Sequence, residues 1–99
     1  MLEHVVLIKP KAIIDPNAVT ALWAGLGRLR QSIPGIVGLA VGENVSPEGK
    51  DLGFTLGFIV SFESRAALES YLPHPEHLAV VPLVRAVADD TLVFDLVRN

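Results

Sequence analysis

The chain has 99 residues, 51% of them hydrophobic and 19% charged, with a formal net charge of −3 at pH 7 and no cysteine. This length supports one domain over residues 1–99, and the composition excludes a membrane-spanning segment, a basic surface for nucleic acid, disulfides and a Cys-ligated metal. Because the start also lacks the basic region of a signal peptide, we expect a cytoplasmic protein.

The first half of the chain predicts a strand, a helix and a second strand. Alternation over residues 2–9 predicts a strand with His4 on its apolar, inward face. Asp15 and Pro16 are typical of a helix start, and a hydrophobic stripe that includes Trp23 recurs at helical spacing until Pro34. Residues 36–43 form the next expected strand, and a polar loop follows over residues 44–51.

The third expected strand, residues 53–62, has the clearest alternation in the sequence. Five large apolar side chains share one face: Phe54, Leu56, Phe58, Val60 and Phe62. A face of this kind requires a cover of helices. The side chains of the opposite parity are small or mildly polar, which is typical of neither a core nor a free surface.

Two helical segments and a last strand complete the pattern. Ser64 is the expected N-cap of a helix that ends before Pro73, and Pro75 begins a further segment. Because Pro82 lies inside that segment, we expect a kink or a fresh start near Val81. Residues 91–97 form the final expected strand.

The order strand, helix, strand, strand, helix, strand predicts an α+β fold with a ferredoxin-like antiparallel sheet and its helices on one face. The other sheet face is then left uncovered. We expect apolar side chains on it, namely Val5, Leu7, Ile59, Val93 and Val97. Water is a poor partner for such a face, so we expect a homodimer through the open sheet face, burying roughly 800 Å² per subunit.

The segment from Tyr71 to His77 gathers the groups best able to move a proton near neutral pH. It contains the only tyrosine and two of the three histidines, His74 and His77. A neutral imidazole at His77 is suited to a general base, and Tyr71 is suited to donate a hydrogen bond to a carbonyl oxygen that gains charge. The alternative is that both residues only pack at a helix junction. The three-residue spacing of His74 and His77 is interrupted by Pro75, so we expect neither a metal nor a cofactor.

Several motifs, in the same order along the chain, resemble the stress-responsive A/B barrel (Dabb) domain family. They are His4-Val5-Val6-Leu7-Ile8-Lys9, Ile33-Pro34-Gly35-Ile36, Gly42-Glu43-Asn44-Val45-Ser46, Gly53-Phe54-Thr55, Phe62-Glu63-Ser64 and Tyr71 through His77. The resemblance implies a dimeric α/β barrel, in which two ferredoxin-like sheets pack face to face. It also implies a pocket between sheet and helices within each subunit.

A plant member of this family folds a linear polyketide into an aromatic acid through an aldol-type closure. By position in the motifs, its catalytic tyrosine and histidine resemble Tyr71 and His77, and a histidine that lines its pocket resembles His4. It has a further histidine where this chain has Leu56, which implies a more apolar pocket and another substrate. We therefore assign Tyr71 and His77 as catalytic candidates, and the substrate-binding candidates are His4, Phe54, Leu56 and Trp23.

Three functions remain open from the sequence. The first is a cofactor-free cyclase, isomerase or lyase that acts on a small carbonyl compound. The second is a dimer without turnover that binds a small apolar ligand or protects under stress. The third is a cofactor-independent monooxygenase, which rests on analogy of fold alone.

Overall fold

The computed structural model describes residues 1–99, which form four strands and three helices. The strands are β1 (Leu2–Pro10), β2 (Ile36–Glu43), β3 (Leu56–Phe62) and β4 (Ala88–Val97), and the helices are α1 (Pro16–Ser32), α2 (Arg65–Tyr71) and α3 (Pro75–Val87). None of these helices combines the length and the hydropathy that crossing a bilayer requires.

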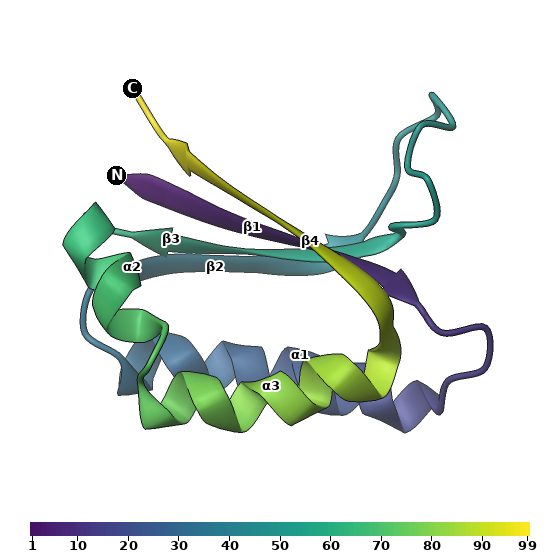
Figure 1. Ribbon diagram of the computed structural model, residues 1–99, viewed down its shortest axis with the longest axis horizontal. Coiled ribbons are helices and arrows are strands. Elements are labelled where there is room, and N and C mark those ends of the chain that lie inside the picture. Colours follow the sequence, from purple (N-terminus) through teal and green to yellow (C-terminus); the bar gives the residue numbers. More distant parts are fainter.

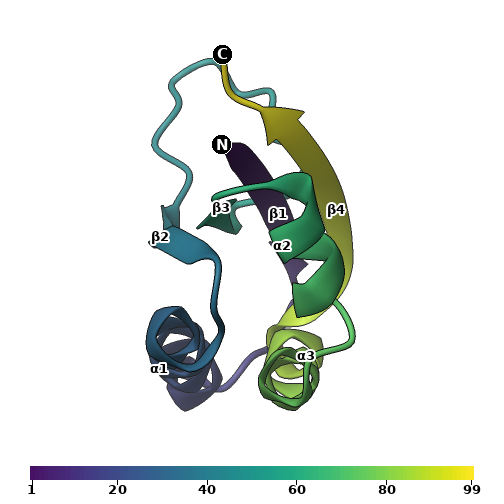
Figure 2. The same ribbon diagram turned by 90° about the vertical axis from the view of Figure 1, so that its left-hand side faces the viewer.

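The four strands form one antiparallel sheet in the order β2-β3-β1-β4. Helices α1 and α3 lie side by side beneath one face of the sheet, and α2 lies near one end of it (Figures 1 and 2). The loop between β2 and β3 stands out on the opposite side (Figure 1). The predicted ferredoxin-like α+β fold is therefore confirmed.

The helices begin where capping side chains are available. The Asp15 carboxylate accepts a hydrogen bond from the Asn17 amide over 2.9 Å, and the Ser64 hydroxyl accepts one from the Ala67 amide over 3.2 Å. Both predicted caps are thus confirmed. The cap of α3 is unusual, because the Nδ1 atom of His74 accepts from the Glu76 amide over 3.1 Å.

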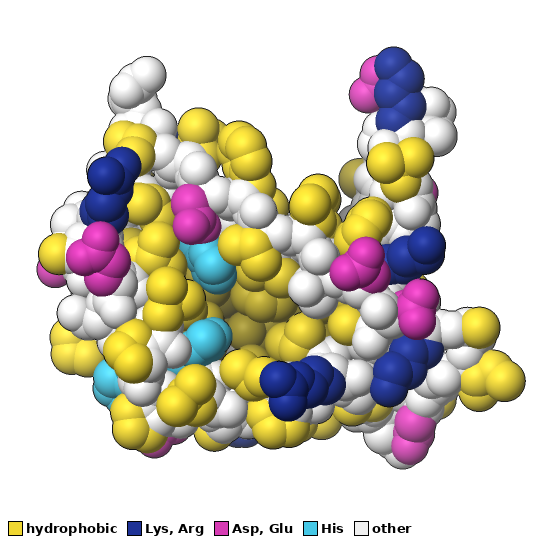
Figure 3. Space-filling model, viewed as in Figure 1, with side chains coloured by type: hydrophobic (Ala, Val, Ile, Leu, Met, Phe, Trp, Pro, Cys, Tyr) yellow, Lys and Arg dark blue, Asp and Glu magenta, His cyan; other side chains and the backbone are white.

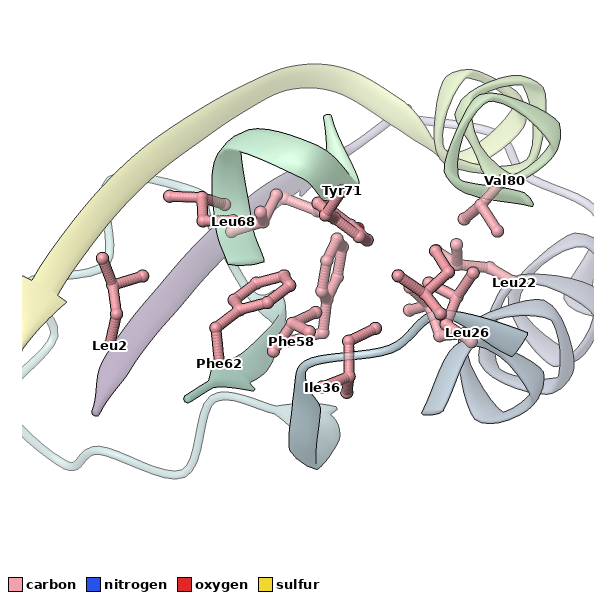
Figure 4. Packing of buried hydrophobic residues seen from close by; sticks show 14 of the residues in the cluster. Leu2, Leu22, Leu26, Ile36, Phe58, Phe62, Leu68, Tyr71 and Val80 are labelled. Atoms are coloured by element: carbon pink, nitrogen blue, oxygen red, sulfur yellow. The ribbon is translucent and has the colours of Figure 1, made fainter. Parts of the chain in front are cut away.

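The core lies between the sheet and the helices (Figure 4). Its buried hydrophobic side chains are Leu2, Val6, Ile8, Leu22, Leu26, Leu29, Ile33, Ile36, Phe58, Val60, Phe62, Leu68, Tyr71, Val80 and Val87. Helices α1 and α3 approach closely at Gly25, where an added Cβ would lie 2.6 Å from Leu83 Cδ1. A glycine is needed there for the two helices to pack without moving that leucine.

Two element predictions were wrong in detail. The third strand begins at Leu56, so Phe54 lies in the preceding loop. Helix α3 also runs without interruption through Pro82, so the fresh start expected near Val81 as the alternative to a kink is absent. Pro82 leaves the carbonyl of Leu78 without a helical donor. Helix α3 nevertheless continues to Val87.

The register of β4 corrects the expected composition of the open sheet face. Val93 pairs with Val6, and Val97 pairs with Leu2, so both valines lie on the helix-facing side. The prediction that these two valines lie on the open face is therefore wrong. The β4 side chains on that face are instead those that pair with the outward residues of β1, namely Leu92, Phe94 and Leu96. Val5, Leu7 and Ile59 lie on the open face as expected.

Candidate functional site

A sharp corner between α2 and α3 brings Tyr71 and His77 together. Tyr71 is the last residue of α2, and His77 lies in the first turn of α3. The His74 amide donates to the Tyr71 carbonyl over 3.0 Å, and the His74 side chain caps α3. The link of three residues therefore has backbone and side-chain hydrogen bonds that fix its path.

The ring of His77 packs on the ring of Tyr71, with centroids 4.2 Å apart and planes inclined by 40°. Its Nδ1 atom lies 2.8 Å from the carbonyl oxygen of Leu72. Because a carbonyl oxygen can only accept, Nδ1 carries the hydrogen, and the Nε2 atom of a neutral imidazole keeps its lone pair. His77 is thus arranged to accept a proton at Nε2.

The Tyr71 side chain lies among Phe58, Phe62 and Leu68 (Figure 4) and is 1% exposed. Burial raises the pKa of Tyr71 to about 12, so its hydroxyl stays protonated at pH 7. The hydroxyl has no hydrogen-bond partner within the protein. Among side-chain polar atoms, only Glu3 Oε2 is both fully buried and without a hydrogen-bond partner. The unpartnered Tyr71 hydroxyl is therefore not fully buried, and it can donate a hydrogen bond to a ligand.

His4 approaches the same tyrosine from the sheet. Its ring centroid lies 5.9 Å from that of Tyr71, and its Nδ1 atom lies 2.5 Å from a carboxylate oxygen of Asp95. The β1–β4 register pairs His4 directly with Asp95, which explains the contact. The carboxylate accepts from Nδ1–H, which leaves the Nε2 atom of a neutral His4 imidazole with its lone pair. Sequence analysis did not identify Asp95, because only the strand register could reveal it.

A hollow between the sheet and the helices lies beside these side chains. Figure 3 shows hydrophobic side chains on its floor and histidine side chains along one part of its rim. The structure thus brings together Tyr71, His77 and His4, three of the predicted site residues. An apolar hollow with a few convergent polar groups is typical of small-molecule sites.

The other substrate-binding candidates, Trp23, Phe54 and Leu56, lie on α1, in the loop before β3 and at the start of β3. Trp23 is half-buried on α1 and packs against the core. Val60 is the β3 residue that pairs with His4. Leu56 precedes Val60 by four residues, a separation of roughly 13 Å along the strand. Phe54 and Leu56 border a groove of about 640 Å³ that includes Val5, Leu7 and the polar loop. This groove involves the open sheet face, and it does not contain Tyr71 or His77.

No group of three or more histidine, cysteine, aspartate or glutamate side chains is arranged to hold a metal ion. His74 and His77 do not converge, because the Nδ1 atom of His74 binds the Glu76 amide and that of His77 binds the Leu72 carbonyl. Beside Tyr71, the hollow offers imidazole, phenol and carboxylate groups.

Comparison with known proteins gives a consistent result along the whole chain. The family model of the stress-responsive A/B barrel domain, Dabb, matches residues 2–98. The stress-response A/B barrel domain-containing protein HS1 of Arabidopsis thaliana is 30% identical over 93 residues, which cover 94% of this chain and 85% of that protein. Olivetolic acid cyclase of Cannabis sativa is 26% identical over 93 residues, covering 94% of this chain and 92% of the cyclase.

Among solved structures, a dimeric ferredoxin-like protein of unknown function from Jannaschia sp. CCS1 superimposes with a TM-score of 0.86. The two proteins are 27% identical, and the superposition covers 98% of each chain. The fold of this chain is therefore shared with a protein that is described as a dimer.

Proposed function

The chain belongs to the stress-responsive A/B barrel domain family, and from the geometry of its hollow we propose that it is a cofactor-free enzyme. The reaction is of the cyclase, isomerase or lyase type and acts on a small carbonyl compound. His77 is the general base, Tyr71 is the hydrogen-bond donor to the carbonyl oxygen, and His4 orients the substrate.

The observation that carries this proposal is the pairing of a free imidazole nitrogen with a neutral phenol. The hydrogen bond from His77 Nδ1 to the Leu72 carbonyl leaves Nε2 as the basic atom, and the ring stacks against Tyr71 at 4.2 Å. With its pKa raised to about 12, Tyr71 acts as a donor rather than as a base at neutral pH. A base beside a donor is the arrangement that removal of a proton next to a carbonyl requires.

The reaction begins when a proton moves from the substrate to His77, and protons and charge are conserved in each step. His77 Nε2 takes a proton from the carbon next to the carbonyl, and the electron pair of that C–H bond moves to the carbonyl oxygen, which becomes an enolate. The Tyr71 hydroxyl donates a hydrogen bond to this oxygen. In a cyclase, the enolate carbon attacks a second carbonyl, and the alkoxide that forms takes the proton from the His77 imidazolium. In an isomerase, the imidazolium returns the proton to the opposite face of the enolate or to a conjugated carbon. The similarity to olivetolic acid cyclase supports the cyclase type of reaction.

The test is deuterium incorporation from D₂O next to the carbonyl of a panel of aryl ketones and aliphatic aldehydes. The expected result is that the protein catalyses exchange of at least one compound. His77→Asn should reduce the rate by roughly 10²- to 10⁴-fold, the usual contribution of a general base. His74→Asn is the matched control, because asparagine also caps a helix and should leave exchange unchanged. The absence of exchange for every compound would favour a dimer that binds ligand without turnover.

The proposal extends to a homodimer through the open sheet face. That face carries exposed apolar side chains on the central strand β3 and on β4, namely Ile59, Leu92, Phe94 and Leu96. The buried Glu3 lies on the same face, and its Oε2 atom has no donor within the chain. A second copy would cover the apolar side chains and could offer that donor. The dimeric description of the Jannaschia protein supports the same arrangement.

A further inference from the structure

Helix α3 carries a cation on the same side of the molecule as His77. Arg85 follows His77 by eight residues, which places it about 12 Å along the helix axis and about 80° around it. The half-buried Val81 lies between them on this side. Lysine or arginine side chains border the hollow along its α3 rim (Figure 3). Arg85 is the one lysine or arginine of α3, and its position in the last turn of the helix puts it at the end away from His77.

The guanidinium of Arg85 has no anionic partner in the protein. Arg98 forms an ion pair with Glu3, and His4 contacts the Asp95 carboxylate in a pair that is ionic only when the imidazole is protonated. Arg85 takes part in neither contact. Asp89 and Asp90 begin β4 near the same end of α3 but form no ion pair with it. The Lys11 amide donates to the Val87 carbonyl over 2.9 Å, which places a second cationic residue near this end.

The two ends of the hollow therefore differ in charge. At one end, the carboxylate of Asp95 is bound to His4 beside Tyr71 and His77, and this end does not favour a second anion. At the other end, the guanidinium of Arg85 has no ion-pair partner, and its parallel N–H donors match the geometry of a carboxylate or phosphate. An elongated substrate with one anionic end fits in only one orientation, with its carbonyl beside His77.

We propose that Arg85 is a specificity-determining residue that binds an anionic group of the substrate, about 12 Å from the carbon that His77 deprotonates. The substrate class is thus an elongated carbonyl compound with a carboxylate or phosphate at its far end. The inference rests on the proposed function, because it takes the reacting end of the substrate to lie beside Tyr71 and His77. A purely structural role for Arg85 is favourable interaction with the C-terminal end of the α3 dipole.

The test uses 11-oxododecanoate and its methyl ester, which differ in charge at the end far from the carbonyl. Each is titrated against the full chain by NMR, with the His77 and Tyr71 ring signals as the readout. The acid should bind more tightly than the ester by roughly fivefold, the upper range of an exposed ion pair. Arg85→Gln should bring the acid to the affinity of the ester and leave the ester unchanged. Arg85→Lys should retain part of the preference.

Arg30→Gln on the exposed face of α1 is the control, and it should keep the full preference for the acid. A preference that survives Arg85→Gln would overturn the assignment, as would equal affinity of the wild-type protein for the two probes. If the ester shifts the His77 and Tyr71 signals while the acid has no advantage, the hollow binds carbonyl compounds and only the role of Arg85 fails. If neither probe shifts these signals while the protein still catalyses exchange of a panel compound, the elongated substrate class and the role of Arg85 fail and the proposed function stands.

Discussion

His77 donates from Nδ1 to the carbonyl oxygen of Leu72 across 2.8 Å, and this bond can persist whether or not the imidazole is charged. The carbonyl accepts the same N–H in both protonation states, so gain of a proton at Nε2 requires no rotation of the ring. The helix corner thus holds the base in one orientation throughout a cycle of proton transfer. Such fixed positioning reduces the reorganisation that a catalytic step needs.

Tyr71→Phe should separate catalysis from stability. The substitution removes only a hydroxyl that has no partner in the protein, so the free energy of unfolding should change by less than about 1 kcal/mol. Loss of the donor to the carbonyl oxygen should reduce the rate of α-carbon exchange by roughly 10²- to 10³-fold. Chemical denaturation and the exchange assay measure the two effects. A large loss of stability with unchanged exchange would identify the hydroxyl as structural.

Tyr71 should make folding sensitive to alkaline pH. Its pKa is 10.0 in the unfolded chain and is raised to about 12 in the folded protein by burial. The folded state therefore retains a proton that the unfolded state loses, and stability from this group is complete below pH 10 and decreases as pH rises through 12. Denaturation followed by circular dichroism should show this decrease in the wild type and a smaller one in Tyr71→Phe. Equal pH profiles for the two proteins would contradict the assignment.

Asp95→Asn should disturb the orientation and tautomer of His4. Asparagine can either accept from Nδ1–H or donate to a bare Nδ1, so the single tautomer set by the carboxylate is lost. We expect ¹⁵N chemical shifts of His4 to report mixed tautomers, and exchange activity to decrease roughly tenfold to a hundredfold, as for outer partners of functional histidines. Asp90→Asn, on the same strand, is the control. An unchanged His4 spectrum in Asp95→Asn would show that another group fixes the ring.

Gly35→Ala should destabilise the fold. Gly35 has a φ of 91°, and an added Cβ would lie 2.7 Å from the Ala67 Cβ. Backbone strain of this kind costs about 1–3 kcal/mol. Gly27→Ala is the matched control, since no heavy atom lies within 4 Å of its added Cβ and alanine is the better helix former by about 1 kcal/mol. In thermal denaturation, the midpoint of Gly35→Ala should be lower than that of the wild type, and the midpoint of Gly27→Ala should be higher.

Phe94→Asp should prevent dimerisation, whereas Val93→Asp should not. The two residues are adjacent on β4 and similarly exposed, at 60% and 55%, but the register places Phe94 on the open face and Val93 on the helix-facing side. A charge in the centre of an apolar interface cannot be solvated, so only the first variant should become monomeric. Light scattering after size-exclusion chromatography gives the mass. If the two variants have the same mass in solution, the interface does not lie on the open sheet face.

Local signals were sufficient for most of the fold. The caps at Asp15 and Ser64, the proline at the start of α3 and the inward face of β1 all depend on residues close in sequence, and the structure contains each of them. The start of β3 was placed too early because alternation continues into Phe54, where hydrogen bonding to the neighbouring strands has not yet begun. The alternation of apolar and polar residues indicates which face of the sheet a side chain occupies. The ends of a strand are determined by its hydrogen bonding to neighbouring strands.

Long-range relationships could not be obtained in this way. The sequence separates the two parities of β4 correctly, but only its register with β1 determines which parity faces the helices, and this decided the positions of Val93 and Val97. The contact between His4 and Asp95 joins residues 91 positions apart and depends on the same register. The proximity of Tyr71 and His77 could be predicted from the sequence, because a short link connects their helices.

The composition of the chain makes Tyr71 a natural optical reporter. The protein has a single tyrosine, and that residue lies at the proposed site, whereas the single tryptophan, Trp23, lies on α1. Phenol absorption and emission therefore arise from one position, without the overlap that several tyrosines would cause. Ligand occupancy of the hollow can be followed in the unlabelled protein, and energy transfer from Tyr71 to Trp23 offers a measure of the separation between α2 and α1.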